Sequence, residues 1–468
     1  MLFSNPVTSY LHRQNFAFKS IEHPHTDSLQ QAALLCNIAM EKVARAVLLG
    51  DEKGVMLAIL PLSHVINFAT LYKLARRKLE PVERNAARYV FPGCAVGSIP
   101  PVAIPFGVQA IIDEDLLKQD EVFFEPGSHE LLLQMQGEDF ARLHKNSLQG
   151  SFSSPAKSLN ANNNDFVTAS GFADNHGVRQ LRPIEGMKER IKQLTQLPPM
   201  TDLTARLLKL QSDPEATIEQ LAEVVESDPS LCAQLLRQAR SPYYGYPGKL
   251  DTIEQAINQV LGFDTVVNTA LAISTLRPFD IPKEGVLGLQ PLWRHAVFSA
   301  MLAQSLCSLL PRSLDIKPDT AYLAGLLHNF GFLVLGHLLK PEFFLLNRVV
   351  SANPEVPITL IEKRTLGITH TQVGSWLMHA WRMPRVLEIT LREHHNESYQ
   401  GDYAIYANLI LLVDCLLKPY GLGDANDETP PAAILNQLGL SLDRARDVTE
   451  RMMQSAKELD NMATALTA

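Results

Sequence analysis

The chain has 468 residues, of which 46% are hydrophobic and 20% are charged, so it is long and apolar enough for two globular folding units. Its formal net charge of −8 argues against a protein that coats nucleic acid by charge alone. The cysteines are widely spaced and form no CxxC pair, which excludes a zinc knuckle or a disulfide framework. Without a signal segment or a run of ~18 apolar residues, the expected location is the cytoplasm, with no membrane partner.

The first 145 residues alternate between two kinds of pattern. Short runs of aliphatic residues predict strands at 44–50, 54–61 and 107–113, whereas apolar residues at helical spacing predict helices within 28–40 and 66–90. Such alternation is typical of a mixed sheet covered by helices. We therefore predict an N-terminal α/β domain over residues 1–145.

Residues 146–184 have the composition of a linker. The stretch from 146 to 175 contains six Asn, six Ser and no sustained apolar period. This composition is typical of a flexible connection between domains.

After the linker, strand patterns nearly disappear and apolar residues recur at helical spacing. Capping residues or first-turn prolines mark expected helix starts at Asp213-Pro214, Asp228-Pro229 and Lys317-Pro318. We predict an all-helical domain over residues 185–420 and a helical extension over residues 421–468.

Histidines are concentrated in one part of the helical region. Seven of the fourteen lie between residues 293 and 395. Any one of them is well explained as an ordinary core or surface residue. Neutral imidazole is nevertheless a common metal ligand, and a helix bundle can aim ligands inward from several helices.

The ordered segments WRHAVFSA, AYLAGLLHNFGFLVLGH, LGITHTQVGSWLMHAW, LREHHNE and LILLVDCLLK resemble the HD superfamily of metal-dependent phosphohydrolases. With the preceding LPPM, ESDPSLCAQLLRQARSPYYG and IEQAINQVLG, the chain is more similar still to the HDOD family of bacterial signalling and regulatory proteins. The resemblance implies a divalent metal, Mn, Fe or Zn, as the cofactor. The implied metal-site residues are His295, His328, Asn329, His370, His394, His395 and Asp414.

One of these positions departs from the HD pattern, which has a carboxylate where this chain has Asn329. An amide oxygen can ligate a metal, but it brings no negative charge and cannot accept a proton from water. We expect this residue to weaken metal retention and hydroxide generation.

Four N-terminal segments, IEHPHT, VARAVLLGD, FPGCAVGSIPP and VQAIID, resemble the YbaK family of aminoacyl-tRNA deacylase domains, also found inserted in bacterial prolyl-tRNA synthetases. In this family, a loop that runs from a glycine to prolines holds an aminoacyl group against backbone atoms. A glycine lets the ligand approach the backbone closely, and prolines hold the following loop rigid. The resemblance implies a tRNA 3′ end or an aminoacyl small molecule as the partner. The implied aminoacyl-binding residues are His23, Gly97, Ser98, Ile99, Pro100, Pro101 and Asp113.

This domain also departs from its family at a demanding position. The family usually places a lysine, thought to be essential for deacylation, where this chain has Arg45. Arginine replaces the compact ammonium group of lysine with a planar guanidinium group, and the two are not interchangeable at a shaped site. An editing reaction would need Arg45 to hold the tRNA 3′ end near the Gly97 loop; the alternative is an aminoacyl-binding module without turnover.

Both halves thus resemble enzymes altered at one critical residue. We expect a regulatory, signal-transduction protein, non-catalytic or weakly active, whose helical domain binds a signalling protein or a nucleotide. The alternatives are an aminoacyl-tRNA editing hydrolase with Arg45 as the catalytic residue, and a metal-dependent phosphohydrolase at His295, His328, His370 and Asp414.

Overall fold

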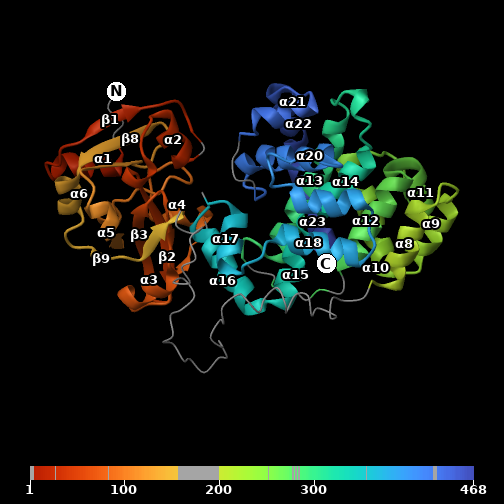
Figure 1. The fold of residues 1–468 in the computed structure, drawn as a ribbon, viewed down its shortest axis with the longest axis horizontal. Helices are drawn as coiled ribbons and strands as arrows, with labels where there is room; N and C mark the ends of the chain where they lie inside the picture. The colour runs from red at the N-terminus through yellow and green to blue at the C-terminus, as the bar shows by residue number, and fades with distance from the viewer. Residues whose placement is uncertain are drawn as a thin grey trace. The chain divides into compact units, whose positions relative to one another are not determined.

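The computed structural model describes residues 5–467, apart from 27, 83, 157–199, 251, 277–278, 280–281, 283–284, 355 and 425–428. The chain forms two compact units (Figure 1). The first comprises Met1–Pro183 with Arg348–Val356, and the second comprises Ile184–Asn347 with Pro357–Ala468. The first unit is mixed α/β and the second is helical, which confirms the predicted fold class.

The first unit contains three small sheets and several short helices (Figure 1). Its strands are β1 (Lys19–Glu22), β2 (Ala44–Asp51), β3 (Gly54–Pro61), β4 (His64–Ile66), β5 (Glu80–Pro81), β6 (Gln109–Asp113), β7 (Glu121–Phe124), β8 (Leu131–Gln136), β9 (Leu148–Gly150) and β10 (Ser153–Pro155). Its helices are α1 (Pro6–Arg13), α2 (Leu29–Leu35), α3 (Phe68–Ala75), α4 (Arg84–Val90), α5 (Glu114–Leu117) and α6 (Gly137–Leu143).

The largest sheet has the order β5-β2-β3-β6-β9. Strands β2 and β3 form an antiparallel hairpin, whereas β6 pairs in parallel with both β3 and β9. Sheets β1-β8-β7 and β10-β4 are antiparallel. The three predicted strands correspond to β2, β3 and β6.

Both faces of the largest sheet are covered by hydrophobic side chains. Along β2, Ala44 and Leu48 pack into one core cluster, while Val47 and Leu49 pack into a cluster on the other face. This follows from the alternation of side chains along a strand. Burial on both faces explains the nearly continuous apolar sequence of the strand.

The structure moves the start of the predicted linker. Strand β9 pairs with β6 and strand β10 with β4, so the first unit continues beyond residue 145. Phe152 between them is buried and provides the apolar anchor that the Ser-rich composition concealed. Residues 157–184 of the predicted linker lie outside the described residues.

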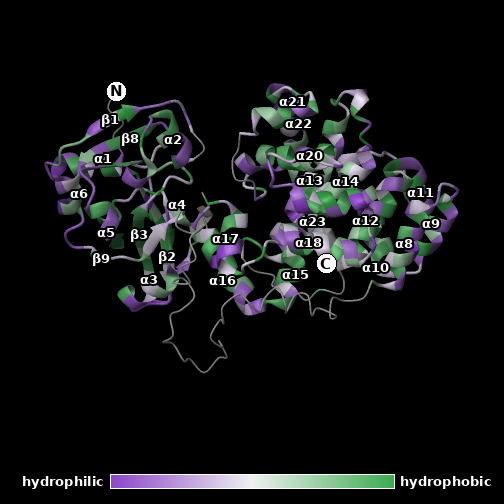
Figure 2. Cartoon of the chain, viewed as in Figure 1, coloured by the Kyte–Doolittle hydropathy of each residue, from purple (hydrophilic) through white to green (hydrophobic). Residues whose placement is uncertain are grey.

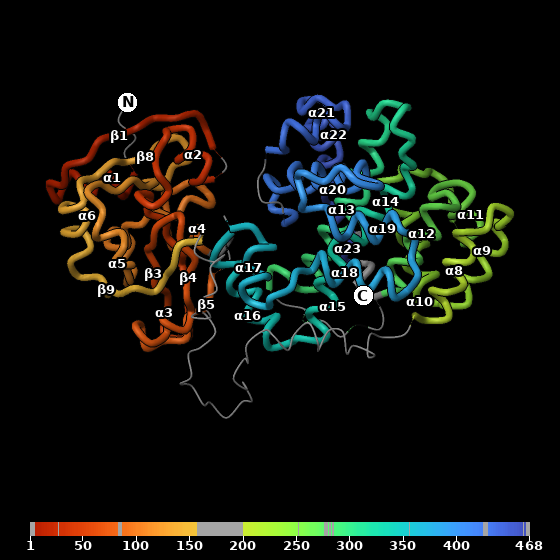
Figure 3. The backbone as a smooth tube through the Cα atoms, viewed as in Figure 1, coloured from red at the N-terminus to blue at the C-terminus, as the bar shows by residue number. Residues whose placement is uncertain are grey.

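The second unit is a bundle of helices around α13, and Figure 3 traces the path of its chain. Its N-terminal helices are α8 (Asp202–Ser212), α9 (Ile218–Glu226), α10 (Pro229–Ala239), α11 (Ile253–Ala256), the π-helical segment Ile257–Leu261 and α12 (Phe263–Leu276). The others are α13 (Leu289–Cys307), α14 (Pro318–Leu327), α15 (Phe330–Leu338), α16 (Lys340–Ala352), α17 (Ile358–Thr365), α18 (His370–Ala380), α19 (Arg385–Glu393), α20 (Ala404–Leu417), α21 (Ala432–Leu438), α22 (Leu442–Met453) and α23 (Ala456–Thr467).

Helix α13 packs against α14, α20, α22 and α23, and α18 packs against α15 and α19. The predicted C-terminal extension is therefore part of this unit's core. The last residues of α16, from Arg348, belong to the first unit.

Two of the three predicted helix starts are correct and one is wrong. Asp228 caps α10, with Pro229 in its first turn, and Pro318 begins α14. Asp213 instead ends α8, and α9 begins after a capping box formed by Thr217 and Gln220. The physical reason is that the capping box satisfies the first free N–H groups of α9, whereas Pro214 only stops the helix before it.

One described stretch, Pro318–Leu338, is long and apolar enough to cross a membrane, and 89% of its most apolar window is buried inside the protein. Figure 2 shows α15, its second half, largely in the hydrophobic colour. The stretch lies in the core of the helical unit, as expected of the central helices of a bundle.

Candidate metal centre

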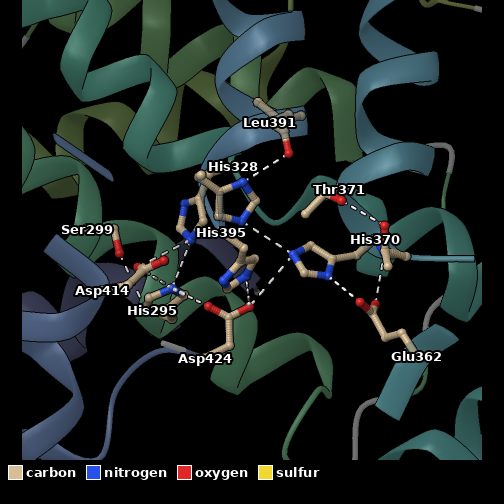
Figure 4. Close-up of polar contacts among 12 residues, drawn as sticks. His295, Ser299, His328, Glu362, His370, Thr371, Leu391, His395, Asp414 and Asp424 are labelled. Carbon is tan, nitrogen blue, oxygen red and sulfur yellow. Dashed lines mark hydrogen bonds and ion pairs between the residues drawn. The ribbon is translucent and has the colours of Figure 1, made fainter. Parts of the chain in front are cut away.

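The predicted metal-site histidines and Asp414 meet in the core of the helical unit (Figure 4). They come from five places in the chain: α13, the α14–α15 junction, the first residue of α18, the two residues after α19, and α20. The side chains of all six are at most 9% exposed. Asn329, directly after His328, is also buried, and its Oδ1 has no hydrogen-bond partner among the described residues.

Close helix packing places His370 in the cluster. A Cβ on Gly331 would lie 1.9 Å from the carbonyl oxygen of His370, so glycine lets α15 and α18 touch through their backbones. Thr369 and Gln372 form a capping box that fixes the start of α18 at His370. The ring of His370 stacks on Phe332, with 4.1 Å between the centroids.

The Nδ1 atoms of His328, His370 and His394 face acceptors that fix the tautomers of these rings. His328 Nδ1 lies 2.7 Å from the Gly325 carbonyl oxygen, His394 Nδ1 lies 2.9 Å from the Leu391 carbonyl oxygen, and His370 Nδ1 lies 2.8 Å from a carboxylate oxygen of Glu362. A ring that donates from Nδ1 carries its lone pair on Nε2. This is the outer-shell arrangement that orients histidine ligands of metals.

The Nε2 atoms then converge. Those of His295 and His328 are 2.9 Å apart, and those of His370 and His394 are 3.3 Å apart. Two lone pairs cannot face each other at such distances unless a proton or a metal cation lies between them. The donor set therefore fits a transition metal.

Buried carboxylates complete the cluster. Asp414 Oδ1 lies 3.3 Å from His295 Nε2 and 3.6 Å from His328 Nε2. A second carboxylate, Asp424, lies beside His370 and His395. Neither carboxylate accepts a hydrogen bond from any described residue. Because burying a carboxylate that accepts no hydrogen bond is costly, these oxygens point to a cation as their partner.

Burial and neighbouring charges shift the pKa values of the cluster's side chains in different directions. Burial lowers the pKa of His328 to about 4, and burial together with the neighbouring histidines holds the pKa of His394 well below its ordinary value. Burial alone would lower the pKa of His295 and His395, but Asp414 and Asp424, respectively, raise it overall. Burial would raise the pKa of Asp424, yet the charges of His395 and His370 hold it well below its usual range. The lowered pKa values keep His328 and His394 neutral and Asp424 ionised, which are the states in which these groups ligate metals.

Two members of the site did not stand out in the sequence. Glu362 is fully buried, and its two oxygens accept from the backbone N–H and from Nδ1 of His370. The available signal was a charged residue among the apolar positions of α17. Asp424 lies in the expected C-terminal extension, outside the motifs that carried the resemblance. His379, by contrast, is 79% exposed and pairs with Glu388.

The N-terminal candidate residues fall into two groups, the first around the Gly97 loop. Gly97 has φ +92°, a conformation that favours glycine. Ser98 Oγ donates to Glu125, and the His129 Nε2 atom lies 3.0 Å from the Val96 carbonyl oxygen. The backbone of His23 hydrogen-bonds to Glu130, which brings the IEHPHT segment near this loop. Ile99 packs against the first core cluster and Pro100 and Pro101 are buried.

The second group surrounds Asp113, a fully buried residue at the end of β6. Its Oδ1 accepts from the N–H of Asp115, and its Oδ2 accepts from the N–H groups of Phe152 and Ser153 and from the Ser153 hydroxyl. The carboxylate thus joins β6 to the chain around β10. Its hydrogen bonds serve the fold of the first unit.

Arg45 has its guanidinium occupied by protein groups. It donates to the Ala352 carbonyl oxygen at 2.9 Å, to Asn353 Oδ1 at 2.6 Å and to the His64 carbonyl oxygen at 3.0 Å. Arg45 alternates with Ala44 along β2 and so faces away from the cluster that contains Val102, next to the Gly97 loop. Its planar fork thus ties β2 to β4, to the last residue of α16 and to Asn353 directly after it.

Comparison with known proteins identifies both halves. Residues 197–397 match the family model of the HDOD domain. The helical unit is an HDOD domain. Residues 23–143 match the model of the aminoacyl-tRNA editing domain, so the YbaK-like resemblance is confirmed as well.

Three known proteins are similar to this chain over different lengths. A crystal structure of a proposed signal transduction protein from Marinobacter aquaeolei VT8 is 26% identical, covers 99% of both chains and has a TM-score of 0.81. An HDOD domain protein of unknown function from Geobacter sulfurreducens is 21% identical over 60% of this chain and 96% of its own, with a TM-score of 0.50. An uncharacterized protein from Treponema pallidum (strain Nichols) is 21% identical over 281 residues, 59% of this chain and 52% of that relative, so this chain spans about half of its length.

Proposed function

We propose that this protein is a regulatory protein whose HDOD domain binds a divalent metal, Mn, Fe or Zn, in a closed site that does not turn over phosphoesters. The observation that carries the proposal is the combination of convergent Nε2 atoms and carboxylates that accept no hydrogen bond with nearly complete burial. A metal hydrolase needs an open coordination position for water and substrate. Here the ligand side chains are at most 9% exposed. The metal then stabilises one conformation, which a signalling protein or a nucleotide recognises on the domain surface.

The N-terminal domain is proposed to bind an aminoacyl or tRNA-related ligand without hydrolysing it. Support comes from Arg45, the residue at the lysine position, because all three of its recorded acceptors are protein groups. A guanidinium held in this way is not available to a tRNA 3′ end. The Gly97 loop remains the proposed contact for the aminoacyl group. A cytoplasmic location is part of the same proposal.

The HDOD proposal is tested by metal analysis of the purified full-length protein together with phosphodiesterase assays on bis(p-nitrophenyl) phosphate and on cyclic dinucleotides. We expect stoichiometric metal and no turnover. Turnover that disappears on chelation would establish the phosphohydrolase alternative, and a protein that takes up no metal would refute metal binding altogether.

The N-terminal proposal is tested with a panel of mischarged tRNAs. We expect no deacylation above the spontaneous rate, but measurable binding of a non-hydrolysable aminoacyl-adenylate analogue. Deacylation that is lost in Arg45→Ala, with folding intact, would show instead that the domain edits tRNA.

A further inference from the structure

Asp424 reaches the metal site from outside the residues that match the HDOD model. It follows α20 and a short turn, more than twenty residues beyond the end of the match at residue 397. Gly423 before it has φ +93°, and a Cβ there would lie 3.0 Å from Cε1 of His295. Glycine at this position therefore lets the backbone pass beside the imidazole and turn the Asp424 side chain inward.

The two oxygens of Asp424 face different groups of ligands (Figure 4). Its Oδ1 lies 4.0 Å from His295 Nε2, whereas its Oδ2 lies 3.4 Å from His395 Nε2 and 3.8 Å from His370 Nε2. The side chain is 8% exposed, and neither oxygen accepts a hydrogen bond from any residue in the described part of the chain. Asp424 therefore has histidines that could ligate a metal on both sides. Among the described residues it has no hydrogen-bond donor.

The ligand atoms around Asp424 fall into two sets. One contains His295, His328 and Asp414 together with Asp424 itself, and the other contains His370, His394 and His395; within each set the atoms lie within 4.8 Å of one another. Ligands bound tetrahedrally at ~2.1 Å from a metal are about 3.4 Å apart. The shortest separations measured are 2.9, 3.3 and 3.6 Å in the first set. In the second set, His370 and His394 are separated by 3.3 Å.

We propose that the HDOD domain holds two metal ions, one in each set, and that the Asp424 carboxylate joins them by giving one oxygen to each. Each set supplies three protein ligands, and one oxygen of Asp424 completes four. The carboxylate also supplies negative charge that Asn329 does not bring. This inference rests on the proposed metal binding. It adds that two ions bind per domain and that Asp424 is the ligand on which this number depends.

The test compares full-length wild-type protein with Asp424→Asn and with the control Asp402→Asn, in which an aspartate that is 72% exposed is changed. The metal-free proteins are titrated with Mn²⁺ alone, and bound metal is counted after gel filtration. We expect two equivalents in wild type and in the control. Asp424→Asn should bind one equivalent or less, with at least tenfold weaker affinity.

Electron paramagnetic resonance of wild-type protein with two Mn²⁺ gives a readout that needs no variant. Two ions joined by a carboxylate should give a spin-coupled spectrum, whereas two separate ions give the six-line signal of isolated Mn²⁺. Two uncoupled ions, a single equivalent in wild type, or unchanged binding in Asp424→Asn would each overturn the proposal while metal binding stands. A wild-type protein that binds no Mn²⁺, Fe²⁺ or Zn²⁺ would refute the proposed metal binding itself.

Discussion

Replacing Gly331 by alanine should disrupt the helix contact that places His370 in the candidate metal site. The added Cβ would lie 1.9 Å from the His370 carbonyl oxygen and 2.7 Å from its Cα, whereas real Cβ contacts essentially never fall below 3.0 Å. Helices α15 and α18 would have to separate by at least about 1 Å, the difference between 3.0 and 1.9 Å. No side chain can relieve this contact because the opposing atoms belong to the backbone.

The expected cost follows from overpacking in a rigid interior. Such changes cost about 1–3 kcal/mol and more where backbones collide, so we take about 3–5 kcal/mol. Alanine recovers about 1 kcal/mol through its better helix propensity. The net loss in the free energy of unfolding is therefore about 2–4 kcal/mol. The metal content should fall too, because metal–ligand distances tolerate only about 0.2 Å of change.

Urea unfolding followed by tryptophan fluorescence measures this change selectively, since Trp293, Trp376 and Trp381 all lie in the helical unit. Gly374→Ala is the matched control: it lies on α18 at the same contact, and its Cβ would meet its nearest atoms at 3.2 Å. We expect the control to lose less than about 1 kcal/mol. The reasoning is refuted if Gly331→Ala is as stable as the control and retains the wild-type metal content.

Three further changes have defined outcomes. In Glu362→Gln, loss of the acceptor for His370 Nδ1 should weaken metal binding by about 10–100-fold, measured by competition with a chelator. In Asn353→Ala, the buried Arg45 loses an acceptor, which should cost about 2–3 kcal/mol, measured by hydrogen exchange of β2. Burial lowers the pKa of His144 to about 4, below its ordinary 6.5, so the stability it contributes is present above pH 6.5 and is lost as the pH falls toward 4. His144→Gln should remove about 2 kcal/mol of this acid sensitivity from the first unit between pH 7 and pH 5, measured by hydrogen exchange at the two pH values.

Each of these changes has a contrary result, and the changes at Glu362 and His144 also have a control variant. Glu388→Gln alters a carboxylate beside the exposed His379 and should leave metal affinity unchanged; equal losses in both glutamate variants would contradict the role of Glu362. Unchanged exchange of β2 in Asn353→Ala would mean that Arg45 does not depend on this acceptor. If the His144 variant keeps the full acid sensitivity, another group causes it, and His379→Gln shows the effect of removing an exposed histidine.

Local patterns in the sequence were sufficient for most of the fold. Continuous aliphatic runs predicted β2, β3 and β6 because strands covered on both faces need apolar side chains throughout. Helical spacing predicted the second unit, and the order of the histidine motifs indicated its family. The short strands β9 and β10 were missed because their pairing partners lie far away in the chain and their own sequence is polar.

The candidate metal site was only partly accessible from the sequence. The order of the motifs brought out the six predicted histidine and aspartate ligands, since each lies in a recognisable segment. Glu362 and Asp424 gave no such signal. A carboxylate becomes a partner of a histidine only when the helices that carry the two residues are packed together.

The sequence by itself determined which residue types are present: imidazoles, an amide at position 329 and a guanidinium at position 45. The tertiary structure decided what each of them meets. It turned the Arg45 fork toward Ala352 and Asn353, and it carried Asp424 from beyond the matched domain to the histidines. The physical reason is that burial and charge pairing depend on contacts between segments hundreds of residues apart, which no local pattern records.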